Sequence, residues 1–348
     1  MDIGIITEAS MTGGASTFTG RYHEVLAEAK LADEVGFSVF GVSEQHFNAP
    51  LCSIPSNELF LAAIAMITKR MRLRTAITLL PYHHPVRVAE QIATLDIFSN
   101  GRVEFGSGKG NSTLASGGFN LDTSETEGRW QEGMDIVTRA WSQDEFSYEG
   151  RFYKVPTRRL APTFPRKPHP DLWYAAISPE SHELAGRKGM GVMSLAVGIT
   201  LKQLEKRMKS YQDAIRNPEP YAGVVNNRFS VFCLAHCADT TAQALAEAAP
   251  PMLHYLKGVI DMYETTLKSQ GKNLDFTATR KIISDFEHLD RTDNVVVGDP
   301  QKLIEKIRRY QALGVQEMLL RMEGLPHQKL MHAIELIGRH VIPAVRLK

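Results

Sequence analysis

The sequence predicts an α/β protein folded as an eight-stranded parallel (β/α)8 barrel, the TIM-barrel architecture, with insertions. Three observations predict it. Short apolar runs alternate with amphipathic helical stretches along most of the chain. The runs are continuously apolar, as expected for parallel strands that are buried on both faces. Eight such runs occur, and no linker rich in proline and glycine divides the 348 residues. A doubly wound open sheet is the alternative fold.

The eight predicted strands share two features. Each is rich in β-branched or other apolar residues, and each ends at a turn or a polar cluster. They are Asp2–Thr7, Phe37–Ser43, Arg72–Leu80, Arg102–Gly106, Leu172–Ile177, Val192–Val197, Arg228–His236 and Glu317–Arg321.

The predicted helices are recognised by apolar residues at spacings of three and four. Ser56 or Asn57 is a candidate N-cap, and Asn100-Gly101 is typical of a left-handed helix end. The expected helices are Tyr22–Glu34, Ser56–Arg70, Pro85–Phe98, Glu125–Trp141, Glu180–Lys188, Leu201–Ile215, Thr241–Leu267, Gln301–Leu313 and Gln328–Ile342.

Two segments interrupt this alternation within what is otherwise one domain, residues 1–348. Residues 146–170 form an expected insertion, because Phe146–Val155 has the pattern of a β-hairpin and Pro156–Pro170 is a connector rich in proline and arginine. Residues Ser269–Val295 are polar and show no period, which predicts a mobile lid.

Composition excludes several kinds of partner. Lys and Arg number 40 against 39 Asp and Glu, a net charge of +1, so neither a nucleic acid nor an acidic membrane is expected as a partner. No apolar stretch approaches the roughly 20 residues that span a membrane, and the start lacks the pattern of a signal peptide. The three cysteines, Cys52, Cys233 and Cys237, make no disulfide framework and are expected to be thiols. A cytoplasmic location follows as an expectation.

Active residues of such a barrel lie where strands end and loops begin. The second strand ends in Glu44, Gln45 and His46, a group that can donate, accept and transfer protons. The alternative is that His46 only forms a hydrogen bond with a neighbouring loop. The third strand is followed by His83 and His84, but no third ligand stands at regular spacing, so no metal site is predicted.

Two further strand ends suggest an anionic ligand. Gly106, Ser107, Gly108 and Lys109 combine small residues, which let a flat ligand approach the backbone, with a charge for a phosphate. No helix opens directly after them, so a dinucleotide fingerprint is not favoured and a plain turn stays possible. After the fifth strand, Ser178 and Ser181 flank a helix start, which is either an anion site or only a cap.

Taken together, these motifs resemble the bacterial luciferase-like, flavin-dependent monooxygenase family. The resemblance covers nearly the whole chain, and the family fold is a (β/α)8 barrel with an insertion. The matching residues are Glu44–Phe47, Thr75-Ala76, Leu80-Pro81, His84–Arg87, Glu90, Leu95-Asp96, Ser99, Gly101-Arg102, Phe105-Gly106, Lys109-Gly110, Arg129, Ser178–Gly189 and Val297–Pro300.

The resemblance implies reduced FMN as cofactor, supplied by a separate flavin reductase. It implies that the phosphate lies near Lys109, Arg129, Ser178 and Ser181 and the ring system near Ala76, Ile77, Gly106, Ser107, Gly108 and Ala176. The Ala76-Ile77 bond stands where luciferases have a non-proline cis peptide. Two positions depart from luciferase. Gln45 stands where luciferase has its catalytic histidine, which makes light emission doubtful, and Gly108 stands where it has a cysteine.

The activity so implied is a two-component monooxygenation, in which molecular oxygen forms a peroxyflavin that oxygenates a small or carrier-bound substrate. Glu44, Gln45 and His46 are the expected catalytic residues, and no metal is expected. A homodimer is expected, with an apolar helix face as a candidate interface. The alternatives are a deazaflavin-dependent hydride transferase and a non-catalytic flavin-binding subunit of a heterodimer. That face comprises Leu59, Phe60, Ala63, Ile64 and Ile67.

Overall fold

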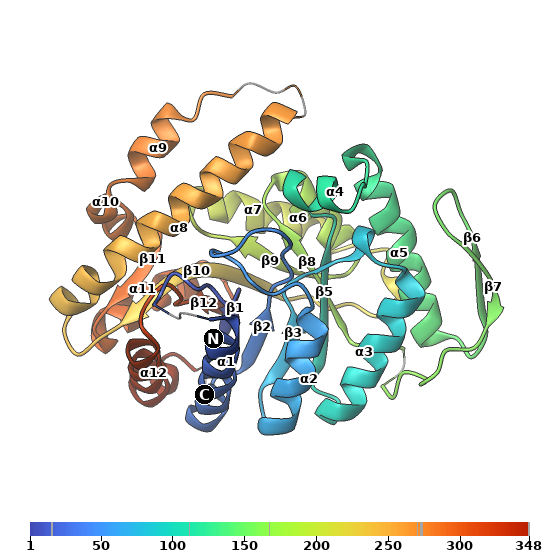
Figure 1. Ribbon diagram of the computed structural model, residues 1–348, viewed down its shortest axis with the longest axis horizontal. Coiled ribbons are helices and arrows are strands. Elements are labelled where there is room, and N and C mark those ends of the chain that lie inside the picture. Colours follow the sequence, from blue (N-terminus) through green and yellow to red (C-terminus); the bar gives the residue numbers. More distant parts are fainter. Residues whose placement is uncertain (15–16, 111, 167, 270, 272–273, 347–348) are drawn as a thin grey trace.

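Eight parallel strands close into a barrel with helices around it (Figure 1). The computed structural model describes residues 1–348 except 15–16, 111, 167, 270, 272–273 and 347–348. Hydrogen bonding follows the order β1-β2-β3-β5-β8-β9-β10-β12 and returns to β1, which confirms the predicted fold. The barrel strands are β1 (Asp2–Thr7), β2 (Val39–Val42), β3 (Arg72–Thr75), β5 (Val103–Gly108), β8 (Asp171–Ala176), β9 (Gly191–Leu195), β10 (Phe229–Cys237) and β12 (Glu317–Arg321).

Helices connect the strands and cover the outside of the barrel (Figure 1). Asn100 ends α3 in the left-handed conformation, as predicted. The helices are α1 (Phe18–Val35), α2 (Asn57–Ile67), α3 (Pro85–Ser99), α4 (Thr113–Gly118), α5 (Thr126–Ser142), α6 (Pro179–Arg187), α7 (Leu201–Ala214), α8 (Thr241–Ser269), α9 (Thr277–Ile283), α10 (Phe286–Arg291), α11 (Pro300–Ala312), α12 (His327–Leu336) and α13 (Ile342–Val345), with a π-helical turn at Ile337–Val341 and 3-10 turns at Leu80–Tyr82, Thr123–Glu125 and Tyr221–Gly223. No helix of the described residues is long and apolar enough to cross a membrane.

The predicted third strand is split in two. The peptide bond between Ala76 and Ile77 is cis, as the resemblance implied. The chain then resumes as β4 (Thr78–Leu79), which pairs with the end of β5. The expected insertion forms a separate antiparallel pair, β6 (Phe146–Glu149) and β7 (Lys154–Arg158), which stands away from the barrel (Figure 1).

The prediction that residues 269–295 lack regular structure was wrong for part of that segment. Helices α9 and α10 lie there, and β11 (Val295–Gly298) pairs with the end of β10. The reason is a short apolar spacing that the polar background obscures: Ile283, Phe286 and Leu289 pack in one cluster with residues of α8. Residues 270 and 272–273 lie outside the described part of the chain, and the lid itself stays a prediction.

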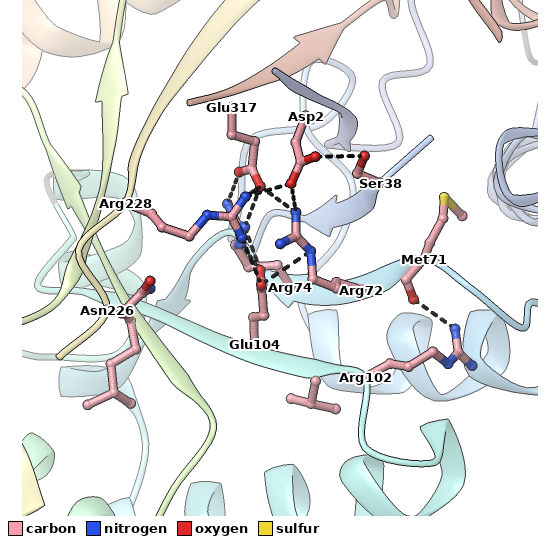
Figure 2. A network of polar contacts seen from close by, with 12 residues as sticks. Asp2, Ser38, Met71, Arg72, Arg74, Arg102, Glu104, Asn226, Arg228 and Glu317 are labelled. Carbon is pink, nitrogen blue, oxygen red and sulfur yellow. Dashed lines mark hydrogen bonds and ion pairs between the residues drawn. The ribbon is translucent and has the colours of Figure 1, made fainter. Parts of the chain in front are cut away.

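The barrel interior is built in layers. At the amino ends of the strands, the buried Arg74 bridges Glu104 and Glu317 (Figure 2). Its guanidinium lies 3.6 Å from the centre of the Trp173 ring. Arg72, Arg228 and Asp2 complete this network. An apolar layer above it contains Ile6, Val39, Trp173, Met193 and Leu319. The charged network and the apolar layer therefore close the amino end of the barrel interior, and the candidate site residues lie at the carboxyl ends of the strands.

Candidate active site

Strand register brings the predicted site residues to one end of the barrel. Ser107 of β5 pairs with Tyr174 of β8, and Thr78 of β4 pairs with Ser107. Because these strands are parallel and adjacent, their following residues end at the same level. Lys109, two residues beyond Ser107, therefore stands level with Ala176, two residues beyond Tyr174. The mouth of the barrel thus collects the candidate residues of three strand ends.

Glu44 is the centre of the polar cluster at the mouth. Its Oε1 lies 2.8 Å from Nε2 of His46 and 2.7 Å from Nε2 of His83. Its Oε2 accepts a hydrogen bond of 2.9 Å from the amide of Leu79. Burial opposes a charge on Glu44, but these hydrogen bonds outweigh it and hold the pKa of the carboxyl below its usual value. Glu44 is therefore an ionised carboxylate shared by two imidazoles.

The sequence did not connect His83 with Glu44. The sequence pattern gave His83 no carboxylate partner. In the fold, the carboxylate oxygen of Glu44 and the ring nitrogens of His46 and His83 lie within 4.8 Å of one another. Two histidines and one carboxylate are residue types that bind transition metals. The separations of 2.7 and 2.8 Å from Oε1 are those of hydrogen bonds, which account for the arrangement.

Aromatic rings cover His46 on the mouth side. The Phe119 ring meets the His46 ring edge to face at 4.7 Å, and Tyr82 lies 6.4 Å away. Phe47 adopts a left-handed backbone conformation (φ 58°), and a Cβ at Gly118 would stand 2.1 Å from its ring. Gly118 is thus required for this packing. Phe47 and Phe119 nevertheless stay 63% and 46% exposed, so the rim of the mouth is apolar.

The Gln45 side chain belongs to a second polar cluster, centred on Glu8. Its Nε2 donates a 3.0 Å hydrogen bond to Glu8, whose other oxygen is 2.6 Å from Arg321. Burial raises the pKa of Glu8. Sequence reasoning missed this cluster, although charged residues at the ends of β1 and β12 were a signal for it. Its other members are Arg21, Glu28, Tyr255, Glu323 and His327.

Small residues form a continuous patch between β3, β5 and β8. A Cβ added at Gly108 would lie 2.3 Å from Cδ1 of Ile77 and 4.0 Å from the Cβ of Ala175. A Cβ at Gly106 would lie 2.1 Å from the carbonyl oxygen of Thr75. The Ser107 side chain points the other way, because its Oγ accepts a hydrogen bond from Trp130 of α5. Ser107 could therefore offer only its main chain to a ligand at the mouth.

Two basic side chains stand beside this patch, each paired with a carboxylate. Lys109 Nζ is 3.1 Å from Glu127, and Arg129 is 2.7 Å from Glu125. Glu127 also acts on Tyr174 of β8. Burial and the negative charge of Glu127 raise the pKa of Tyr174 to about 12. Both basic groups are partly exposed, so a phosphate could reach them.

Ser178 and Ser181 form a capping box at the start of α6. The Ser178 hydroxyl accepts from the amide of Ser181, and the Ser181 hydroxyl accepts from the amide of Ser178. Ser178 is therefore the N-cap of α6, and the anion site at this helix start stays a prediction. His182 anchors the same turn from inside, with Nδ1 2.7 Å from the Ser178 carbonyl and Nε2 2.8 Å from the Ser194 hydroxyl.

Acid is expected to weaken this anchor. Burial lowers the pKa of His182 to about 4, below the 6.5 of an unfolded histidine. Between these values only the unfolded chain binds the proton, so folding stability falls as the pH drops from 6.5 towards 4, by up to about 3 kcal/mol. Urea unfolding at several pH values measures this loss. His182→Gln should flatten the dependence, whereas His332→Gln, at an exposed histidine, should leave it; equal slopes in all three would contradict the assignment.

Comparisons with known proteins identify the family of this chain. Residues 1–317 match the family described as luciferase-like monooxygenases. The chain belongs to the luciferase-like monooxygenase family. It is accordingly an oxidoreductase, and the resemblance seen in its motifs is confirmed.

Three curated relatives match this protein over most of its length and most of their own. Limonene 1,2-monooxygenase of Rhodococcus erythropolis is 25% identical over 92% of this chain and 81% of its own. The oxygenase component of flavin-dependent trigonelline monooxygenase from Acinetobacter baylyi is 24% identical over 93% and 89%. FMNH2-dependent dimethylsulfone monooxygenase of Pseudomonas putida is 25% identical over 91% and 86%.

Solved structures share the fold over the whole chain. Monooxygenase RslO1 of Streptomyces bottropensis has a TM-score of 0.85 at 24% identity, covering 99% of this chain and 100% of its own. The oxygenating constituent of 3,6-diketocamphane monooxygenase of Pseudomonas putida, in complex with FMN, has a TM-score of 0.80 at 24% identity. The match covers 100% of this chain and 99% of that one. An F420-dependent secondary alcohol dehydrogenase has a TM-score of 0.77 at 18% identity, and the match covers 99% of each chain.

Proposed function

We propose that the protein is the oxygenase component of a two-component monooxygenase that uses reduced FMN, molecular oxygen and a separate flavin reductase. One observation carries this proposal: a patch of small residues and a pair of basic side chains meet at the same barrel end as a carboxylate bonded to two imidazoles. Those are, in order, the surfaces that a flat ring, a phosphate and a proton transfer need.

The residues present fit FMN. A phosphate would replace Glu127 as the partner of Lys109 and Glu125 as the partner of Arg129. The hydroxyls of Ser178 and Ser181, which now bond within the cap of α6, would turn to donate to the same phosphate. Ala76, Ile77, Gly106, Gly108, Ala176 and the main chain of Ser107 would hold the ring system. Bound reduced FMN would supply the electrons that activate oxygen. The names of the trigonelline and dimethylsulfone enzymes support a reduced flavin and a separate component.

The polar cluster would handle protons. Glu44 holds the His46 ring in place through a 2.8 Å hydrogen bond, so His46 can accept or give a proton at its other nitrogen. Gln45 cannot exchange a proton near neutral pH, and its amide would orient a polar group instead. The aromatic rim of Phe47, Tyr82 and Phe119 would exclude water, as would closure of the lid at residues 269–295.

Deazaflavin-dependent hydride transfer is a second candidate. It is supported by the F420-dependent secondary alcohol dehydrogenase, which has the same fold. Oxygen consumption separates the two. With a flavin reductase and FMN, the protein should bind FMNH2 and, given substrate, form an oxygenated product that contains one atom of labelled oxygen. Anaerobic turnover with reduced deazaflavin would reject the proposed activity.

We further propose a homodimer formed through α2 and α3. Of the predicted face, Leu59, Ala63 and Ile67 are exposed, whereas Ile64 is buried in the core and Phe60 packs on Tyr22. Met66, Ile97 and Phe98 extend the exposed apolar surface.

Charges on this surface should weaken the dimer. Leu59→Asp with Met66→Asp is expected to raise the dimer dissociation constant at least about tenfold, since carboxylates lose hydration on burial. Sedimentation over a range of protein concentration measures this. Ile282→Asp, at an exposed apolar residue of α9, is the control. A wild-type protein that is monomeric throughout would refute the dimer.

A further inference from the structure

His83 shares the Glu44 carboxylate with His46, and the proposed function assigns it no part. The two histidines come from different loops, one after β2 and one after β4 and its 3-10 turn. Both Nε2 atoms lie within 2.8 Å of the same oxygen, Glu44 Oε1. Because an ionised carboxylate can only accept hydrogen bonds, both Nε2 atoms carry a hydrogen. In a neutral ring, Nδ1 is then an acceptor.

The surroundings of the two rings differ. The His46 side chain is 9% exposed and lies beneath Phe119 and Tyr82. The His83 side chain is 29% exposed and borders a small cavity between α2 and α3. Glu58 and Gln91 line that cavity. No described residue forms a hydrogen bond with Nδ1 of either ring. His46 therefore lies under the aromatic rim, and His83 lies beside the cavity between α2 and α3.

The charges around the pair favour a proton on His83. Burial opposes it, but the hydrogen bond to Glu44 and the charges of Glu44 and Glu58 outweigh burial and raise the pKa of His83. Tyr82 is a further titratable neighbour, and burial and the charge of Glu44 raise its pKa, so it stays neutral. One carboxylate that already holds one imidazolium attracts a second only weakly, because two like charges within 4.8 Å repel.

We propose that His83 sets the protonation state of His46: as an imidazolium it occupies the Glu44 carboxylate, which keeps His46 neutral, with its Nδ1 lone pair free to accept a proton at the mouth. His83 is thus a positioning residue that acts through Glu44. This role rests on the proposed function, since it prepares His46 as the base of that reaction. When His46 accepts a proton at Nδ1, it becomes an imidazolium whose Nε2–H stays bonded to Glu44.

The test is an NMR titration of the histidine rings in the protein without cofactor, so that it does not depend on turnover. His83→Gln keeps a donor towards Glu44 but removes the second titrating ring. It should raise the titration midpoint of His46 by about one pH unit or more. His84→Gln, at the neighbouring exposed histidine, should leave it unchanged. The pH profile of oxygen consumption should shift to higher pH in His83→Gln alone.

Several outcomes would overturn the proposal. The same His46 midpoint in wild type and His83→Gln would show that the rings are not coupled. If His83→Gln does not fold, the wild-type titration decides instead: His83 must protonate at higher pH than His46, and the reverse order refutes the role. Glu44→Gln should lower both midpoints. FMNH2 binding is measured on the same samples, so a failure of the proposed function appears there and not in the titration.

Discussion

Replacing Arg74 with methionine is expected to lower the free energy of unfolding by about 3–5 kcal/mol. Arg74 is fully buried and bridges Glu104 and Glu317, which are themselves buried (Figure 2). Its removal leaves two carboxylates in the barrel interior whose cationic partners among the described residues are then Arg72 and Arg228, both partly exposed. Burial of a charge with weakened compensation is among the most costly single changes. Urea denaturation measures the loss.

The matched control for this prediction is Arg87→Met. Arg87 also pairs with a glutamate, Glu90, but its side chain is 71% exposed and the separation is 3.6 Å. Exposed pairs of this kind contribute less than about 1 kcal/mol. If the two variants were equally stable, the network at the amino ends of the strands would not be what closes the barrel interior.

Lys109→Ala combined with Ser178→Ala is expected to raise the dissociation constant of FMNH2 at least about a hundredfold. Hydrogen bonds to a charged phosphate contribute about 1.5–3 kcal/mol each, so two of them amount to about 3 kcal/mol or more. Both side chains lie at adjacent strand ends, at the level of Ala176. Anaerobic fluorescence titration measures the constant.

Two controls accompany that double variant. Lys69→Ala with Ser142→Ala changes the same residue types at the carboxyl ends of α2 and α5, which lie at the opposite end of the barrel. It should leave the constant unchanged. Riboflavin, which lacks the phosphate, should bind wild type and the Lys109/Ser178 variant alike. An unchanged dissociation constant of FMNH2 in that variant would show that Lys109 and Ser178 do not bind the phosphate.

The strand pattern was sufficient to predict the barrel because most strands are largely apolar between recognisable turns, although β3 (Arg72–Thr75) is not. Runs such as Ile3–Ile6 and Met318–Leu320 are buried on both faces, so their composition is dictated by the fold. The helices of residues 277–291 were missed for the opposite reason. Few of their residues face the core, and a short helix gives too few apolar positions to establish a period.

The site was predictable only within each strand end. Glu44 and His46 are two residues apart, so a shared role was visible in the sequence. His83 is 39 positions beyond Glu44, and Arg321 is 313 positions beyond Glu8. Those contacts depend on which loops meet at the mouth, which is set by the closure of the barrel. The direction of Ser107 likewise depends on the Trp130 partner supplied by α5.

The most direct test of the central claim is anaerobic binding of FMNH2 to the purified protein, compared with oxidised FMN and with a reduced deazaflavin. FMNH2 is expected to bind more tightly than either, and mixing the complex with oxygen should give a transient change in absorbance. Binding of the deazaflavin alone, or no binding of FMNH2, would contradict the central claim.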